Sequence, residues 1–302
     1  MTAVLTPPGA TPRPVVGARL LLLGCVVVWG WTFVAMKILL KVVDPIEVVG
    51  LRFGLGLPLL FLIAKRSGSG FAFAPRDAGP LTVGAALICV HFLVQPIGVH
   101  LTTATKTGWI IAVTPLVLAL LSGWLLRETV TRAHRAGIAM ASAGILLLVS
   151  QGDLRQLWQG SAGDWLVLGT AFTWALYTIA TRDLSRRCPS LVVTCAVFVP
   201  VTVMALAWAA VHSGPAIFSR FSPLAWGALA FLAVLGTLAQ WFWQIGVARL
   251  GAAKAGMFLY LEPLATTALA VPLLGEPLTP AIVAGGALVL LGVWWGERGP
   301  AA

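Results

Sequence analysis

Residues 106–131, KTGWIIAVTPLVLALLSGWLLRETVT, return 148 positions later as residues 254–279, KAGMFLYLEPLATTALAVPLLGEPLT. Leucine matches could arise from composition alone, whereas a Lys, a Gly, a Pro and a Glu in one register indicate duplication of a helical unit. The repeat predicts that the chain consists of two related halves. The nine matched pairs are Lys106/Lys254, Gly108/Gly256, Pro115/Pro263, Leu116/Leu264, Leu121/Leu269, Leu125/Leu273, Leu126/Leu274, Glu128/Glu276 and Thr131/Thr279.

The composition predicts an integral membrane protein. Of the 302 residues, 59% are hydrophobic and only 10% are charged, and the mean hydropathy is +0.95. A water-soluble domain of this length cannot bury so much apolar surface. Water-soluble enzymes and binding modules are therefore excluded.

Apolar runs of about 20 residues recur along the chain, each long enough to cross a hydrocarbon core of ~30 Å as a helix. The alternating ten-residue pattern of membrane β-barrel strands does not occur. Since backbone polar groups must be paired in lipid, we expect an all-α integral membrane protein with ten transmembrane helices. The expected spans are 19–40, 46–64, 79–100, 107–126, 134–150, 164–181, 190–211, 224–248, 255–275 and 280–297.

The net charge of +10 predicts membrane topology rather than a nucleic-acid partner, because the basic residues are scattered at expected helix ends and form no patch. With the N-terminus in the cytoplasm, most of the 20 Lys and Arg residues fall near cytoplasmic helix ends. This positive-inside bias predicts a multi-pass protein of the cytoplasmic membrane with both termini in the cytoplasm.

The expected domain organisation has four parts. Residues 1–18 form a Pro-rich cytoplasmic tail, 19–150 the first repeat, 151–163 an external linker and 164–298 the second repeat. The apolar run after the tail is too long for a signal peptide and is expected to be retained as a helix. The four cysteines include no C-x-x-C pair, so neither a disulfide framework nor a metal site is predicted.

The two halves are expected to be inverted with respect to each other. Trp29 and Lys37 of the first span match Trp174 and Arg182 of the sixth, so the repeat extends beyond the opening pair. Each half has five spans, an odd number, and the second half must therefore enter the membrane from the opposite side. Inverted repeats are typical of secondary transporters, whose substrate site lies between the repeats near the membrane midplane.

These motifs resemble those of the EamA-type members of the drug/metabolite transporter superfamily. The resemblance covers residues 19–297 and rests on the Trp-Gly opening of the first span, the Pro within spans 4 and 9, and the Glu that closes each of them. Its most specific part is LEPL…LLGEPLT in residues 261–279. It implies a bacterial exporter of amino acids or other small metabolites, with a cavity lined by spans 1–4 and 6–9 and with spans 5 and 10 peripheral.

Two charged residues fall within expected spans. Glu262 should face a cavity or a partner, because a carboxylate in lipid is costly; it serves either the cavity or, protonated, the carbonyls freed by Pro263. Arg52 either snorkels or pairs with Glu47, or it presents its guanidinium to a substrate carboxylate.

Polar and aromatic residues at matching repeat positions complete the candidate substrate site. His91 with Gln95, and Gln240 with Gln244, are i, i+4 pairs that form polar stripes in the related spans 3 and 8. Such stripes either join helices or line the cavity. Five aromatic residues are candidates for a wall against a hydrophobic substrate: Trp29, Trp109, Trp174, Tyr177 and Tyr260. The alternative for these residues is ordinary packing, and for Trp109 it is also a place in the aromatic belt at the membrane interface.

Gly108 and Pro115, and their counterparts Gly256 and Pro263, are expected to let spans 4 and 9 bend during gating. Glu128 and Glu276 are interpreted as structural residues at helix junctions.

The expected function is secondary export of small metabolites, most of all aromatic or bulky neutral amino acids, by a monomer without a cofactor. No G-x-x-x-x-G-K-[ST] loop indicates ATP hydrolysis, and no G-x-S-x-G motif or other catalytic residues are identified. A carrier of phosphorylated metabolites or nucleotide sugars is the alternative within the class, and it would require several cationic residues in the cavity. An intramembrane enzyme or receptor is the alternative from another class.

Overall fold

Helices account for all the regular secondary structure that the computed structural model describes, in residues 15–126, 131–150, 153, 155, 161–275 and 278–297. Most of residues 1–18 and 151–163, which the sequence predicts to be a tail and a linker, lie outside these residues, as do Glu128 and Glu276. In order, the elements are α1 (Val15–Leu39), α2 (Pro45–Arg66), η1 (Pro75–Asp77), α3 (Ala78–Leu101), α4 (Ala104–Ile111), α5 (Thr114–Leu125), α6 (Arg132–Ser150), α7 (Ala162–Arg187), α8 (Ser190–His212), η3 (Gly214–Arg220), α9 (Pro223–Leu250), α10 (Ala252–Phe258), η4 (Leu259–Leu261), α11 (Glu262–Leu274) and α12 (Pro280–Glu297).

Seven helical segments among the described residues are long and apolar enough to cross a membrane. They contain α1, α2, α3, α4 with α5, α8, α9, and α10 with α11. The other three expected spans are also helical, as α6, α7 and α12. α6 begins with basic residues and α7 is charged at both ends, whereas the apolar part of α12, Val283–Gly296, is short.

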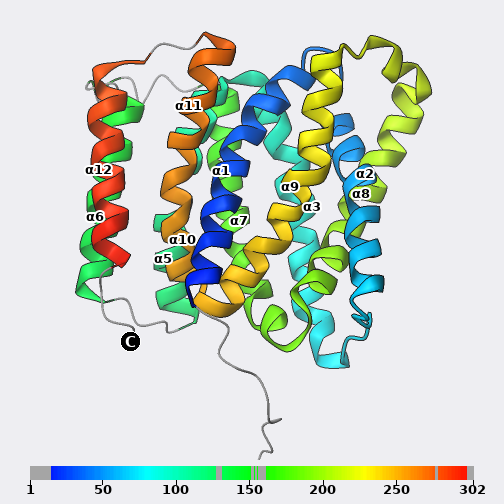
Figure 1. Cartoon of the computed structure of the whole chain (residues 1–302), viewed down its shortest axis with the longest axis horizontal. Helices are drawn as coiled ribbons and strands as arrows, with labels where there is room; N and C mark the ends of the chain where they lie inside the picture. The colour runs from blue at the N-terminus through cyan, green and yellow to red at the C-terminus, as the bar shows by residue number, and fades with distance from the viewer. Residues whose placement is uncertain are drawn as a thin grey trace, which may run out of the picture.

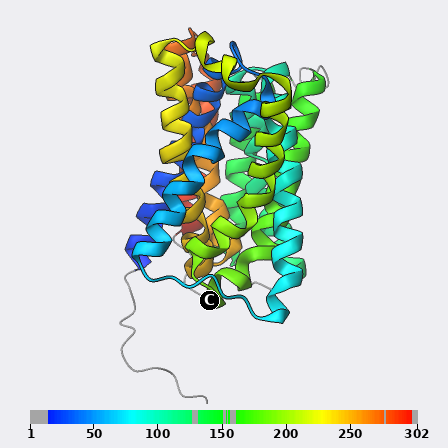
Figure 2. The same cartoon turned by 90° about the vertical axis from the view of Figure 1, so that its right-hand side faces the viewer.

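The helices stand roughly side by side in both views of the molecule (Figures 1 and 2). Their most extensive contacts pair α3 with α7, α1 with α9, α2 with α8 and α6 with α12. Every one of these pairs combines a helix before residue 151 with a helix after residue 160. The halves of the chain are therefore interleaved, and neither half encloses a core of its own.

Hydrogen bonds at the helix ends fix the directions of α1, α3 and α7. The Lys37 Nζ near the end of α1 donates to the His100 carbonyl near the end of α3, at 3.3 Å, so α1 and α3 are parallel. Arg187 at the end of α7 bonds to Asp77 just before α3, at 2.9 Å, so α3 and α7 are antiparallel. Hence α1 and α7, the first helices of the two matching regions, run in opposite directions. The beginning of α1 and the end of α12 lie at the same end of the bundle (Figure 1).

Both segments that carry the repeated proline, Ala104–Leu125 and Ala252–Leu274, are broken, whereas α2 and α8 continue through Pro58 and Pro200. In the first segment, α4 ends at Ile111 and Pro115 is in the first turn of α5; in the second, η4 separates α10 from α11, and Pro263 is in the first turn of α11. Proline has no N–H to donate to the preceding turn, and at the start of a helix that donor is not needed. The prolines thus start new helices at equivalent points of the two halves.

Helices α6 and α12 pack closely through glycines at one edge of the bundle (Figure 1). A Cβ atom on Gly144 would lie 2.6 Å from the Gly285 carbonyl oxygen, and one on Gly137 would lie 2.5 Å from the Gly292 carbonyl oxygen. Small residues let helix backbones approach this closely in a membrane, where van der Waals packing drives association.

Candidate functional site

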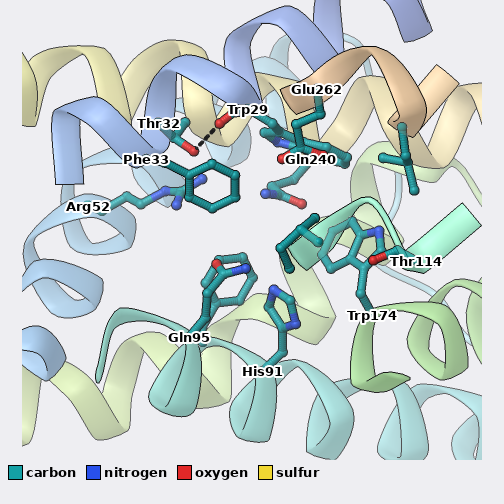
Figure 3. Close-up of a pocket in the computed structure, with 13 residues that line it drawn as sticks. Trp29, Thr32, Phe33, Arg52, His91, Gln95, Thr114, Trp174, Gln240 and Glu262 are labelled. Carbon is teal, nitrogen blue, oxygen red and sulfur yellow. Dashed lines mark hydrogen bonds between the residues drawn. The ribbon is translucent and has the colours of Figure 1, made fainter. Parts of the chain in front are cut away.

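A cavity of about 40 Å³ lies where the two halves meet, between helices from both. It has room for roughly three water molecules, at the ~10–15 Å³ that each requires. In this form the cavity is smaller than a metabolite. Its lining residues are Trp29, Thr32, Phe33, Arg52, His91, Phe92, Gln95, Ile111, Thr114, Trp174, Gln240, Leu259 and Glu262 (Figure 3).

Seven of the residues predicted from the sequence to bind substrate line this cavity together. They come from six helices, of which α1, α2 and α3 belong to the first half of the chain and α7, α9 and α11 to the second. The seven are Trp29, Arg52, His91, Gln95, Trp174, Gln240 and Glu262.

Arg52 of α2 extends into the cavity and is only 3% exposed. Its Nη2 donates to the Gly236 carbonyl oxygen at 3.3 Å, and its guanidinium carbon lies 4.8 Å from the ring centre of Phe53 and 5.4 Å from that of Phe92. No carboxylate among the described residues forms an ion pair with it, and its Nε has no partner there. A charged group buried in this way costs about 2.5–3.5 kcal/mol on membrane-insertion scales.

Arg52 neither pairs with Glu47 nor snorkels to the membrane interface, the two structural roles that the sequence also allowed. The Glu47 carboxylate accepts instead from the backbone N–H of Asp44, at 3.0 Å, and so caps the start of α2. Because Arg52 is buried beside the cavity, its guanidinium does not reach the membrane interface. On α9, Gly236 leaves room for this group, since a Cβ there would lie 3.0 Å from Nη2.

Glu262 begins α11 and is also 3% exposed. Close backbone contact positions it, because a Cβ on Gly30 would lie 2.6 Å from the Glu262 carbonyl oxygen. The carbonyl freed by Pro263 is that of Leu259, and it accepts from the backbone N–H of Glu262 rather than from the side chain. No described residue forms a hydrogen bond or ion pair with the Glu262 carboxylate, which lines the cavity.

His91 and Gln95 of α3 line the side of the cavity that lies opposite Glu262 (Figure 3). The His91 Nδ1 lies 3.1 Å from the Thr170 carbonyl oxygen and 3.1 Å from Thr173 Oγ1. A carbonyl only accepts, so Nδ1 carries the hydrogen, and in the neutral ring Nε2 remains an acceptor.

Two tryptophans at matching repeat positions form one wall. The ring centres of Trp29 and Trp174 lie 5.0 Å apart in an edge-to-face arrangement, and Trp243 packs against both. Neither the Trp29 nor the Trp174 indole N–H has a hydrogen-bond partner among the described residues. Buried indole N–H groups usually have one, so these two donors are available to a ligand in the cavity.

Four residues of the predicted site lie outside the cavity lining. Gln244 is held in a buried network in which its Nε2 donates to the hydroxyls of Tyr177 and Thr181, and its Oε1 accepts from Ser185 at 2.8 Å. The Tyr260 hydroxyl lies 3.1 Å from Ser142 Oγ. Trp109 is buried in the cluster near α6 and α12 with Tyr260.

The glycines predicted to act in gating lie at close helix crossings. A Cβ on Gly108 would lie 3.0 Å from Thr266 Oγ1 on α11, and one on Gly256 would lie 2.9 Å from Leu118 on α5. With Pro115 and Pro263 at the helix breaks, these residues surround the crossing of the two broken segments.

Six lining residues were not among the predicted site residues. Most of them are next to, or within one helical turn of, a residue that was predicted, and this proximity is a sequence signal that could have found them. Thr114 has a further signal, since it occupies the position of Glu262 in the first half. The six are Thr32, Phe33, Phe92, Ile111, Thr114 and Leu259.

The chain is similar over most of its length to proteins described as transporters. A Bacillus subtilis protein described as "Uncharacterized transporter YyaM" is 27% identical, over 91% of each chain. A Salmonella typhimurium protein described as "Probable amino-acid metabolite efflux pump" is 28% identical, over 89% of this chain and 91% of its own. A Streptantibioticus cattleyicolor protein described as "Probable terminal-alkyne amino-acid exporter" is 31% identical, over 65% of this chain and 64% of its own.

One solved crystal structure superposes with a TM-score of 0.76 at 21% sequence identity, covering 93% of this chain and 98% of the other. This likeness supports the overall arrangement of the helices. The EamA-like transporter family matches the sequence twice, over residues 17–150 and 161–295. Together these two regions make up most of the chain, which therefore belongs to the EamA-like transporter family.

Proposed function

We propose that this member of the family is a secondary exporter of amino acids, with aromatic or bulky neutral ones preferred. The observation that carries the proposal is the cavity between the halves, which contains an arginine with no ion-pair partner among the described residues. A buried guanidinium binds a carboxylate through two parallel hydrogen bonds, and α-amino acids offer that group.

The aromatic wall supports the preference for a bulky side chain. Trp29 and Trp174 present large apolar surfaces beside the polar groups, and apolar walls with a few polar anchors are typical of small-molecule sites. Two relatives, described as a "Probable amino-acid metabolite efflux pump" and a "Probable terminal-alkyne amino-acid exporter", support the same substrate class.

The transport cycle would alternate the access of this cavity between the two sides of the membrane. The proposed architecture is ten spans in two inverted five-helix repeats, 19–150 and 164–298, with the tail (1–18) and both termini in the cytoplasm and the linker (151–163) outside. Opposite directions of α1 and α7 support the inversion. Because the cavity of about 40 Å³ must widen to admit an amino acid, we expect opening at the breaks beside Pro115 and Pro263.

The two alternatives have less support. A carrier of phosphorylated metabolites would need several cations, whereas Arg52 is the one Lys or Arg among the lining residues described. Lys106 instead pairs with Asp164, at 3.5 Å. An enzyme or receptor would not require two interleaved halves that run in opposite directions.

The test is counterflow in proteoliposomes. Purified protein is reconstituted with one unlabelled amino acid inside, and uptake of the same labelled amino acid is followed for each of the common amino acids, with and without a pH gradient. We expect exchange that is fastest for aromatic and bulky neutral amino acids and absent from protein-free vesicles. Absence of exchange for every amino acid, with a labelled phosphorylated sugar exchanged instead, would overturn the proposal.

A further inference from the structure

The cavity carries two opposite formal charges from different halves of the chain. Arg52 comes from α2 and Glu262 from α11, both are buried, and both line the same cavity (Figure 3). Glu262 has a threonine, Thr114, at its equivalent position in the first half, so the carboxylate breaks the symmetry of the repeat. A residue that served only the helix break would be expected in both halves.

Arg52 and Glu262 do not pair with each other in this cavity. No ion pair joins them, because the Arg52 nitrogens and the Glu262 carboxylate oxygens lie more than 4.0 Å apart. Arg52 bonds to the Gly236 carbonyl and contacts two aromatic rings, and the Glu262 carboxylate has no partner among the described residues. Each charge is thus available to a ligand.

The remaining polar groups of the cavity include both donors and acceptors. Trp29 and Trp174 contribute indole N–H donors, and the Gln240 Oε1 is an acceptor, all without partners among the described residues. The neutral His91 ring adds its Nε2 as an acceptor. The acceptors suit an ammonium group, which has only hydrogen-bond donors. The guanidinium and indole donors suit a carboxylate, which has only acceptors.

We infer that the site recognises a zwitterion, with Arg52 binding the carboxylate and Glu262 the ammonium group of one α-amino acid. This inference rests on the proposed function and narrows its substrate class to amino acids with both ends free. A zwitterion leaves the loaded cavity without a net charge. A carboxylic acid alone would leave Glu262 buried without a partner, and an amine alone would do the same to Arg52, so both should be rejected.

The test compares three ligands of one shape. The amino acid that exchanges fastest in counterflow is competed against its deamino acid and its decarboxylated amine; for phenylalanine these are 3-phenylpropanoate and 2-phenylethylamine. We expect the native protein to bind the amino acid at least tenfold more tightly than either analogue, measured by inhibition of exchange and by the ligand-induced shift of the unfolding temperature. Equal binding of the deamino acid by the native protein would overturn the inference, and no substitution is needed to see it.

Two variants then assign the two ends. Glu262→Gln should no longer bind the amino acid more tightly than the deamino acid, but it should still bind the amino acid more tightly than the amine. Arg52→Gln should no longer bind the amino acid more tightly than the amine, but it should still bind the amino acid more tightly than the deamino acid. Asp183→Asn, a change of an exposed carboxylate far from the cavity lining, is the matched control and should behave as the native protein. If Glu262→Gln folds and weakens all three ligands equally, the ammonium assignment is wrong. Failure of every amino acid to exchange in the native protein would instead reject the proposed function itself.

Discussion

At the scale of single residues, the surroundings of Arg52 explain why a guanidinium is needed there. The group is planar, lies over Phe92 and bonds to a carbonyl of α9 while it faces the cavity. A lysine would keep the charge but lose the flat contact and the paired donors. The charge alone is therefore not expected to be sufficient.

We predict that Arg52→Lys weakens amino-acid binding about tenfold, which corresponds to about 1.4 kcal/mol. The measurement is the apparent affinity in counterflow, with the unfolding temperature of the ligand-free protein as a check on folding. An affinity equal to that of the native protein would show that the fork of donors is not used.

Trp29 and Trp174 are the residues expected to sense the size of the side chain. Replacing either with alanine should weaken binding of aromatic amino acids by about 1 kcal/mol, or about fivefold, more than binding of alanine or serine, because stacking and apolar area are lost. Trp124→Ala is the control, since that indole is 77% exposed on the outside of α5. Equal losses for all substrates would indicate that the two indoles only pack the bundle.

At the scale of the elements, the broken segments are the expected moving parts. Pro115→Ala and Pro263→Ala would each allow a continuous helix, because alanine restores the backbone donor. We predict that turnover falls about tenfold in each variant while the affinity for substrate changes less than twofold, since the cavity side chains stay. Pro272→Ala, in α11 but beyond the break, should leave turnover unchanged. Native turnover in both break variants would exclude the prolines from the cycle.

The glycine contacts of α6 and α12 belong to the same scale, and they affect stability rather than transport. Gly144→Ala should lower the unfolding free energy by about 1–3 kcal/mol, because its Cβ would lie 2.6 Å from the Gly285 carbonyl and the helices must separate. Gly24→Ala is the matched control, since no heavy atom lies within 4 Å of the position of its Cβ. The comparison is made by denaturation in detergent, and similar values for the two variants would contradict the prediction.

At the scale of the whole molecule, the proposed topology places two described residues, Gly68 and Asp153, on opposite sides of the membrane. In a background without the native cysteines, a cysteine in place of Gly68 should react with an impermeant thiol reagent only from the cytoplasmic side, and one in place of Asp153 only from outside. Both positions are exposed, so access depends on the side of the membrane alone. Labelling of both from one side would contradict the inverted arrangement.

Sequence alone determined the class of the protein and the boundaries of most helices. Hydropathy and the repeat are properties of chain order, because the length of a helix that crosses lipid and the spacing of duplicated residues do not depend on contacts. The repeat also singled out Pro115 and Pro263, and the structure starts a helix at each. Arg52 and Glu262 stood out because charges inside an apolar run need a polar surrounding.

Only the tertiary structure decided which polar residues meet at the cavity. Gln95 and Gln244 occupy comparable places in their i, i+4 pairs, yet Gln95 lines the cavity and Gln244 is bonded to Tyr177, Thr181 and Ser185. Sequence periodicity gives the face of a helix but not the neighbour that covers it. That neighbour depends on how the two halves interleave, and it is the interleaving of α3 with α7 and α1 with α9 that gathers the site.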